Sequence, residues 1–388
     1  MNTQDNSRRI TRREFLKLTG AAMTSVALAG CWRNVSGEEK QASQVSDGWV
    51  SSSPTAEGLD ADKIAEMLEK VHKGDYGSVH SILIVKGGKL AVEEYFSGYE
   101  YDLEDVNARG PVIDFGPDTL HDQASVSKNI TSALIGIAID QRFITSVSEN
   151  LFTFFPEYSR LMDDEKAKIT LEHLLTMSSG LEWLQSGPGS DTGRLFSVDN
   201  PIEYILKKPV VSTPGTQFNY QQANPILLGE IIKKATELRV DDFAEKYLFA
   251  PLGITQREWR SLSRNVIYTA GDVRLRPRDM AKFGYLFLCN GDWNGQRVIS
   301  EEWVQESTKR RIMGDYGLMY GYLWWISPFR ENGFLAMGRG GQGVFIFPDV
   351  DLVAIFTGGN YAHIESGNEP YVPISLTQNY ILPSIVSH

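Results

Sequence analysis

The spacing of apolar side chains predicts a helix and a β-hairpin near the start of the folded body. Residues 60–73 carry apolar side chains at positions i, i+3, i+4 and i+7, which is typical of one face of a helix. Two runs rich in apolar and β-branched residues follow, at 81–85 and 90–96, on either side of a Gly-Gly pair. Such runs around a glycine turn predict a hairpin.

The middle of the chain has helical spacing, and strand-like runs return near the C-terminus. Helices are predicted at 125–142, 171–175, 226–235, 242–248 and 278–288. Strands are predicted at 320–326, 333–337, 343–347 and 352–357. Two separate domains would explain this order, but one antiparallel sheet built from both ends, with a helical insertion, is more economical. We therefore expect an α/β (α+β) fold with a sheet lobe (about 58–135 and 285–388), flanked by helices, and a helical lobe (about 136–284).

The first part of the chain has the pattern of an export signal rather than of a folded element. Arg12-Arg13 precedes a run of small apolar residues that is too short to span a bilayer. The arginine pair with the residues after it resembles a twin-arginine export signal. Leu28-Ala29-Gly30-Cys31 resembles a lipobox, in which Cys31 would be the site of lipid attachment. A simple secretory signal with a coincidental cysteine, or an uncleaved anchor, is the alternative. The expected division is a signal at 1–30, a flexible tether at 31–57 and a body at 58–388.

Charge and histidine content narrow the class of partner. The 388 residues carry a formal net charge of −11, which argues against binding nucleic acid, since phosphates require a basic face. The six histidines form no metal-binding motif, so we expect neither a metal site nor a cofactor. The expected partners are a small-molecule substrate and, through the lipid anchor, a membrane on the exported, periplasmic side of the cell envelope. The oligomeric state does not follow from the sequence.

Ser125-Val126-Ser127-Lys128 is the motif that carries chemistry. Ser125 begins a predicted amphipathic helix, where free N–H groups favour a developing negative charge. Lys128 follows at i+3 and so lies on the same face. A serine hydroxyl is a poor nucleophile until a base takes its proton, and a lysine is such a base only when its pKa is lowered. A solvated serine and lysine at a helix start is the alternative.

Further stretches follow the Ser-x-x-Lys motif in a fixed order. The set is Ser125-x-x-Lys128, Ile169 to Leu181, Pro214 to Tyr220 with Leu227-Leu228-Gly229, Arg276 to Gly284, and Trp293-Asn294-Gly295. Together these stretches make the chain resemble the class C β-lactamase and penicillin-recognising family of serine hydrolases. The resemblance covers about residues 57–385 and is strongest to the family's esterase and 6-aminohexanoate-oligomer hydrolase members.

The resemblance implies a β-lactamase/transpeptidase-like fold and a role for each matching residue. Tyr220 would be the second acid or base, with its phenolate shared between Lys128 and Ser125. The Gly-rich element Gly338-Arg339-Gly340-Gly341-Gln342 would line the site, with Arg339, Gly340 and Gly341 binding substrate. The backbone N–H groups of Ser125 and Gln342 would form the oxyanion hole. The exact register of this element stays open at the sequence level.

Two positions depart from the family's pattern. Gln222 stands where most members have Asn in a Tyr-x-Asn motif, so the amide is one methylene further from the backbone, and Asn224 is a candidate to replace it. Arg339 stands where β-lactamases have Lys, and it presents a rigid fork suited to a carboxylate. Both departures argue against efficient β-lactam hydrolysis.

We therefore expect a serine hydrolase, a carboxylesterase or amidase that cleaves a small ester or amide through an acyl-Ser125 intermediate, with Lys128 and Tyr220 as general base and acid. One alternative is a D-alanyl-D-alanine carboxypeptidase or weak β-lactamase. Another, from a different class, is a catalytically quiet lipoprotein that binds the cell wall. Covalent labelling of Ser125 discriminates the enzymes from the quiet protein.

Overall fold

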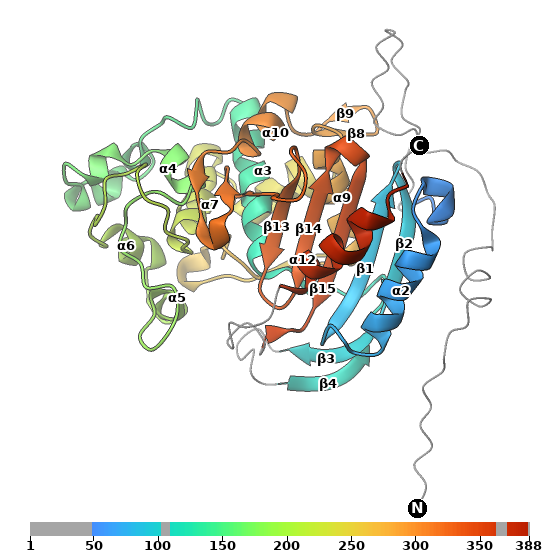
Figure 1. Cartoon of the computed structure of the whole chain (residues 1–388). Helices are drawn as coiled ribbons and strands as arrows, with labels where there is room; N and C mark the ends of the chain where they lie inside the picture. Colours follow the sequence, from blue (N-terminus) through green and yellow to red (C-terminus); the bar gives the residue numbers. More distant parts are fainter. Residues whose placement is uncertain (1–48, 102–108, 362–370, 387–388) are drawn as a thin grey trace, which may run out of the picture.

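One large antiparallel sheet forms the centre of the molecule (Figure 1). The computed structural model describes residues 49–101, 109–361 and 371–386. The strand order in the sheet is β10-β11-β12-β13-β14-β15-β1-β2. The strands are β1 (Val79–Lys86), β2 (Lys89–Tyr95), β10 (Ile312–Met313), β11 (Met319–Tyr320), β12 (Trp325–Ile326), β13 (Phe334–Gly338), β14 (Gln342–Phe347) and β15 (Leu352–Gly358).

The two ends of the body meet in this sheet, as the sequence predicts. β1 pairs antiparallel with β15, from Val79 opposite Gly358 to Lys86 opposite Leu352. β1 and β2 form the predicted hairpin, and both glycines of its turn, Gly87 and Gly88, have positive φ, where a side chain would be strained. The prediction of an antiparallel sheet flanked by helices is therefore confirmed.

Helices cover both faces of the sheet. Gly284 of α9 (Pro277–Leu288) approaches so closely that a Cβ there would lie 2.8 Å from the side chain of Val344. Gly343, the neighbour of Val344 in β14, faces Pro373 of α12 (Val372–Leu376) instead. Since successive strand residues point to opposite faces, α9 and α12 lie on opposite sides of the sheet. α2 (Ala61–His72) is near the end of the chain, because it contacts the segment that follows α12 (Figure 1).

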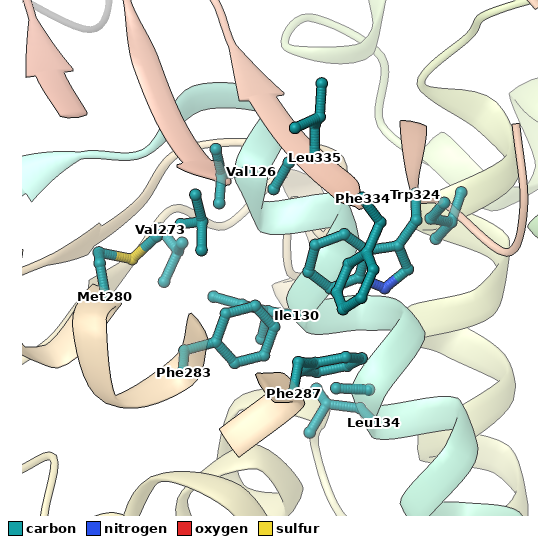
Figure 2. Packing of buried hydrophobic residues seen from close by; sticks show 14 of the residues in the cluster. Val126, Ile130, Leu134, Val273, Met280, Phe283, Phe287, Trp324, Phe334 and Leu335 are labelled. Carbon is teal, nitrogen blue, oxygen red and sulfur yellow. The ribbon is translucent and has the colours of Figure 1, made fainter. Parts of the chain in front are cut away.

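A helical region lies beside the sheet, and α3 (Ser127–Asp140) runs between the two (Figure 1). Ile130 and Leu134 of α3 pack among Phe283 and Phe287 of α9 (Figure 2). The prediction that this helix is amphipathic is wrong, because every residue from Ser127 to Ala138 is buried, so α3 has core contacts on all sides.

Apart from α7, the remaining helices and strands are short. The other helices are α4 (Leu171–Leu175), α5 (Asp191–Leu195), α6 (Pro201–Leu206), α7 (Ala223–Thr236), α8 (Val240–Ala244) and α10 (Glu301–Ser307). Smaller sheets are formed by β3 (Ser97–Tyr101) with β4 (Arg109–Asp114), by β5 (His121–Asp122), β7 (Val273–Leu275) and β6 (Glu258–Trp259), and by β8 (Asp292–Trp293) with β9 (Gln296–Arg297). No helix in the described ranges is long and apolar enough to cross a membrane.

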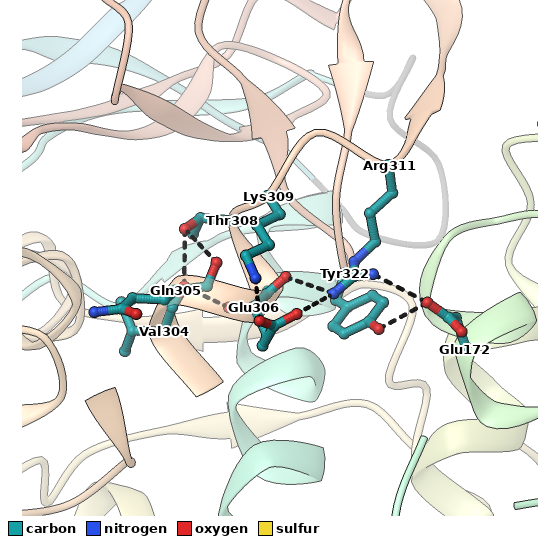
Figure 3. A network of polar contacts seen from close by, with 9 residues as sticks. Glu172, Val304, Gln305, Glu306, Thr308, Lys309, Arg311 and Tyr322 are labelled. Carbon is teal, nitrogen blue, oxygen red and sulfur yellow. Dashed lines mark hydrogen bonds and ion pairs between the residues drawn. The ribbon is translucent and has the colours of Figure 1, made fainter. Parts of the chain in front are cut away.

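Polar contacts tie the helical region to the sheet (Figure 3). Arg311, next to β10, donates to Glu172 of α4 and to Glu306 of α10. The hydroxyl of Tyr322 also donates to Glu172 at 2.9 Å. The predicted lobe division places 277–284 in the helical lobe, whereas α9, which contains them, packs on β14 and β15. This helix therefore belongs with the sheet.

Part of the predicted tether at 31–57 is folded. Residues 49–57 belong to the folded body: Trp49 is buried against the rings of Tyr285 and Trp293, and its indole N–H donates to the carbonyl of Arg278. Ser51 forms a β-bridge with Leu90. The polar composition of this segment gave no indication of these contacts. Those of Trp49 are made to residues more than 200 positions away in the sequence. The rest of the tether, the signal and Cys31 lie outside the described residues.

Candidate active site

Ser125 lies in a strained turn that enters α3. It occupies a single 3-10 turn, Ala124–Val126, between β5 and α3, and it is half-buried. Ala124 has φ +44°, a left-handed value that alanine rarely adopts. The Asp122 carboxylate accepts the N–H of Ala124 at 3.0 Å, and the Ser127 hydroxyl donates to the Ala124 carbonyl at 2.7 Å. These two contacts hold the turn that presents Ser125.

Lys128 lies one helical turn after Ser125 and is buried. Its Nζ is 3.0 Å from Ser125 Oγ and donates to the carbonyl of Ala270 at 2.6 Å. Burial lowers the pKa of Lys128 from 10.5 to about 7, although the charge of Asp272 acts in the opposite direction. A large fraction of this lysine is therefore a neutral amine near neutral pH, with a lone pair available to Ser125.

Tyr220 completes the group that the sequence predicts. It lies in the loop before α7, and its ring centroid is 4.9 Å from Nζ of Lys128. Burial raises the pKa of Tyr220 above 10, while hydrogen bonding with Ser125 lowers it. The ring stacks on Trp325 with centroids 5.8 Å apart. The structure thus brings Ser125, Lys128 and Tyr220 together, with Tyr220 in its protonated form at neutral pH.

The two amides considered for the Tyr-x-Asn position lie in different places. Gln222 is buried and its side chain contacts the hydroxyl of Tyr268, while its Oε1 has no hydrogen-bond partner among the described residues. Asn224 is fully buried and its Oδ1 accepts from Ser179 at 2.8 Å. Asn224 is therefore engaged in the core of the helical region, and Gln222 is the amide with a free acceptor.

The Gly-rich element forms the turn between β13 and β14. Gly338 is the residue that meets the Ser125 turn: a Cβ there would lie 2.6 Å from the carbonyl of Gln123 and 3.3 Å from Cβ of Ala124. Gln342 pairs with Gly338 across the turn. Its side chain is buried and hydrogen-bonds the backbones of Gly358 and Arg339. The role of its backbone N–H in an oxyanion hole stays a prediction.

The three predicted substrate-binding residues of this turn differ in exposure. Arg339 is exposed, with its guanidinium 5.9 Å from the ring centroid of Tyr361. Gly340 and Gly341 have φ +87° and +99°, and a Cβ on Gly340 would clash with the Tyr361 ring at 2.6 Å. These glycines are therefore required by the turn itself, and a substrate contact of Arg339 stays a prediction.

Comparison with known proteins identifies the family. Residues 74–362 match the model of the β-lactamase family, described as Beta-lactamase. The chain belongs to the β-lactamase family. It is 23% identical over 296 residues to the 6-aminohexanoate-dimer hydrolase of Paenarthrobacter ureafaciens, covering 71% of each chain. It is 28% identical over 223 residues to Esterase EstB of Burkholderia gladioli, covering 53% of this chain and 54% of that one.

The fold agrees with this assignment. The structure of the octameric penicillin-binding protein homologue from Pyrococcus abyssi superposes with a TM-score of 0.60 at 19% identity, covering 83% of this chain and 77% of that one. This β-lactamase-family chain is therefore a hydrolase of the serine β-lactamase-like type. No cluster of three or more metal-ligating side chains is present in the part of the chain that the structure describes.

Sequence reasoning missed two carboxyl groups near Ser125 and Lys128. Asp122 and Asp272 are close enough for their charges to interact; burial first, and then Asp272, raises the pKa of Asp122 to about 7. Asp272 lies 3.4 Å from Arg260 and also acts on Lys128. Asp122 lies three residues before Ser125, in the sequence Asp-x-Ala-Ser, so its place near Ser125 could have been predicted from the local sequence. Asp272 had no such signal, because the fold alone brings it to the site.

Proposed function

We propose that this β-lactamase-family protein cleaves a small ester or amide through an acyl-Ser125 intermediate. One observation carries the proposal: a buried lysine whose pKa is about 7 lies 3.0 Å from the hydroxyl of Ser125. A lysine that is buried without an ion pair is costly to keep, so a structural role alone does not explain it. This argues against a catalytically quiet binding protein.

In the proposed reaction Lys128 is the general base. Its neutral amine takes the proton of Ser125 as Oγ bonds to the substrate carbonyl carbon. Tyr220, which burial keeps protonated, gives its proton to the departing oxygen or nitrogen as the bond to the acyl carbon breaks, and it is reprotonated from Lys128. A water molecule then attacks the acyl-enzyme, its proton passes to Lys128, and Ser125 leaves with that proton.

Backbone N–H groups beside Ser125 would stabilise the oxyanion. The proposed donors are the N–H of Ser125 and a second N–H from the β13–β14 end, for which Gln342 is the sequence's candidate. The close approach of Gly338 to Gln123 supports a role for this strand end, since a side chain at 338 would push it away from the Ser125 turn. Each such donor is worth about 3 kcal/mol of transition-state stabilisation.

Esters are the proposed substrates rather than β-lactams. Gln222 is one methylene longer than the Asn of most relatives, and misplacement by about an ångström in a reacting complex can cost about a hundredfold. Short esters need little positioning. We expect kcat/KM for p-nitrophenyl acetate or butyrate to exceed that for nitrocefin by at least about tenfold, with Gln222→Asn narrowing the difference. A nitrocefin rate above the esterase rate would favour the β-lactamase alternative.

Covalent labelling tests the proposed nucleophile. A fluorophosphonate should label the protein at Ser125, as mapped by mass spectrometry, and Ser125→Ala should abolish labelling while the protein stays folded. Ser132→Ala is the matched control, because Ser132 lies in the same helix with an Oγ that has no partner among the described residues. An adduct on another serine would overturn the assignment.

We further propose that the protein is exported and anchored through a lipid on Cys31. The motifs at Arg12-Arg13 and Leu28 to Cys31 support this. Acylation stabilises membrane binding by about 0.8 kcal/mol per buried CH₂, so several chains on one cysteine anchor a protein durably. Cys31→Ser should move the protein from the detergent phase to the aqueous phase with its activity unchanged. Unaltered partition would exclude Cys31 as the acylation site.

A further inference from the structure

A largely exposed aromatic side chain projects from the hairpin of β10 and β11. Tyr316 lies at the tip of this hairpin and is 85% exposed. Its φ is +59°, in the left-handed region that a bulky residue rarely adopts. Because the side chain is exposed, its burial contributes little to offset the cost of this backbone conformation. Backbone strain of this kind is concentrated at functional sites.

Tyr316 lies beside the proposed general acid. Its ring centroid is 6.0 Å from that of Trp325, and Trp325 stacks on Tyr220 at 5.8 Å. The hairpin is seated closely on this wall, because a Cβ on Gly314 would lie 2.9 Å from the ring of Trp325 and 3.3 Å from that of Phe218. The rings of Tyr316, Trp325 and Tyr220 thus form a continuous row from the surface to the catalytic group.

Tyr316 lies close enough to Tyr220 and to Tyr371 to interact electrostatically with both. Tyr316 raises the pKa of Tyr220 and also that of Tyr371, in each case as a smaller contribution than burial. The Tyr371 hydroxyl is hydrogen-bonded to Gly338, the residue that meets the Ser125 turn. Tyr316 therefore lies near Tyr220 and near the hydroxyl that contacts Gly338.

The position of the general acid decides which part of a substrate meets this row. In the proposed reaction Tyr220 contacts the atom that leaves, so a group attached to that atom would lie near the rings packed beside Tyr220, which are those of Trp325 and, next to it, Tyr316. Asp315, the neighbour of Tyr316, also acts on Tyr220 by its charge. A negative charge here disfavours an anionic leaving group, such as the carboxylate-bearing amino acid that a carboxypeptidase releases.

We propose that Tyr316 and Trp325 form a subsite for an uncharged aromatic or bulky apolar leaving group. This proposal rests on the proposed function, because it needs Tyr220 as the acid that protonates the leaving group. Aromatic rings favour offset or edge-to-face contacts with other rings, and Tyr316 offers an exposed face for such a contact.

A series of acetate esters tests the subsite. 2-Naphthyl, phenyl and 2,2,2-trifluoroethyl acetate give the same acetyl-enzyme, so differences among them in kcat/KM report acylation and the leaving group. Tyr316→Ala should lower kcat/KM for the naphthyl ester by about tenfold and for the trifluoroethyl ester by less than about twofold, since one ring contact is lost. Tyr316→Phe should retain the naphthyl rate. Tyr99→Ala, which removes an exposed aromatic side chain from β3, is the control and should alter none of the three.

The effect of the Asp315 charge on the leaving group is tested separately. Asp315→Asn should raise kcat/KM for 3-carboxyphenyl acetate relative to phenyl acetate. Equal losses for all three acetates in Tyr316→Ala, or no loss for any, would overturn the subsite. Labelling of Ser125 by a fluorophosphonate distinguishes the two levels: normal labelling with no leaving-group selectivity refutes only the subsite, whereas absence of labelling refutes the proposed function.

Discussion

Two lysines are buried in this protein to almost the same degree, and their surroundings differ. Lys128 is 1% exposed and Lys282, in α9, is 2% exposed. Lys282 lies 3.2 Å from a carboxylate oxygen of Asp279, which is itself fully buried. Asp279 also accepts two hydrogen bonds from Arg276. This lysine is one member of a buried ion-pair cluster.

Lys128 contacts a hydroxyl and a carbonyl instead of a carboxylate. Its amine contacts Ser125 Oγ and the Ala270 carbonyl, and the charge of Asp272 offsets the effect of burial on its pKa only in part. Burial without a carboxylate partner in contact disfavours the charged form of a lysine, which makes the neutral form of Lys128 accessible. The two lysines therefore differ in their contacts rather than in their burial: the lysine without a contacting carboxylate is the candidate base.

The largest expected effect is on catalysis at the unpaired lysine. Lys128→Ala and Tyr220→Phe should each lower kcat by about a thousandfold or more, because each interrupts proton transfer. The double variant should cost little more than either single one, since residues that act as a unit are strongly non-additive. Steady-state kinetics on p-nitrophenyl acetate measures this. Fully multiplicative losses would show that the two side chains serve separate proton paths.

The next effect is on stability at the paired lysine. Lys282→Met leaves the buried Asp279 with only Arg276 and should lower the free energy of unfolding by about 3 kcal/mol. Denaturant titration measures the loss. The activity of the folded fraction should stay unchanged, because Lys282 does not contact the Ser125 group. A loss of kcat without a loss of stability would show that Lys282 acts in catalysis rather than in folding.

A carboxylate near Ser125 extends the comparison. The Asp279 carboxylate forms ion pairs with Arg276 and Lys282. The Asp122 carboxylate instead accepts a hydrogen bond from the N–H of Ala124, in a strained turn. Asp122→Ala should lower kcat by about ten- to a hundredfold with little change in KM, because Ser125 loses its alignment. Asp122→Asn keeps an oxygen acceptor and should retain most of the rate. Equal losses in both variants would assign the role to the charge of Asp122 rather than to its hydrogen bond.

The smallest effect is on pH dependence. With Lys128 as base, kcat/KM should rise with pH to a plateau, with a midpoint near its pKa of about 7. Asp272→Asn should move the midpoint downward, because the charge of Asp272 raises the pKa of Lys128. An upward shift would contradict this assignment.

The same pKa has a consequence for stability with a definite sign. The pKa of Lys128 falls from 10.5 unfolded to about 7 folded, so the unfolded chain binds the extra proton between these values and stability rises with pH through that window. Lys128→Met should therefore raise the melting temperature more at pH 6 than at pH 9. A larger gain at pH 9 would show that the folded lysine is not the group that titrates.

Local patterns determined much of the fold. The helix at 61–72 follows from apolar spacing, and the β1–β2 hairpin follows from Gly87-Gly88, since both depend on neighbours within a few residues. The i+3 spacing of Ser125 and Lys128 is also local, and one helical turn is enough to bring the two together. The single sheet followed from the order of strand-like runs at the two ends of the body.

Tertiary structure decided the rest, because contacts distant in sequence control burial and charge. Burial in α3 lowers the pKa of Lys128, and its amine donates to the carbonyl of Ala270, which lies 142 positions away. The register of the Gly-rich element, with Gly338 against Gln123, depends on how β13 meets the Ser125 turn. Trp49 joined the body through its contact with Arg278, 229 positions later. The sequence by itself predicted Ser125, Lys128 and Tyr220, which the structure brings together. The place of Asp272 near them and the pKa values of Asp122 and Lys128 instead follow from packing that no local pattern encodes.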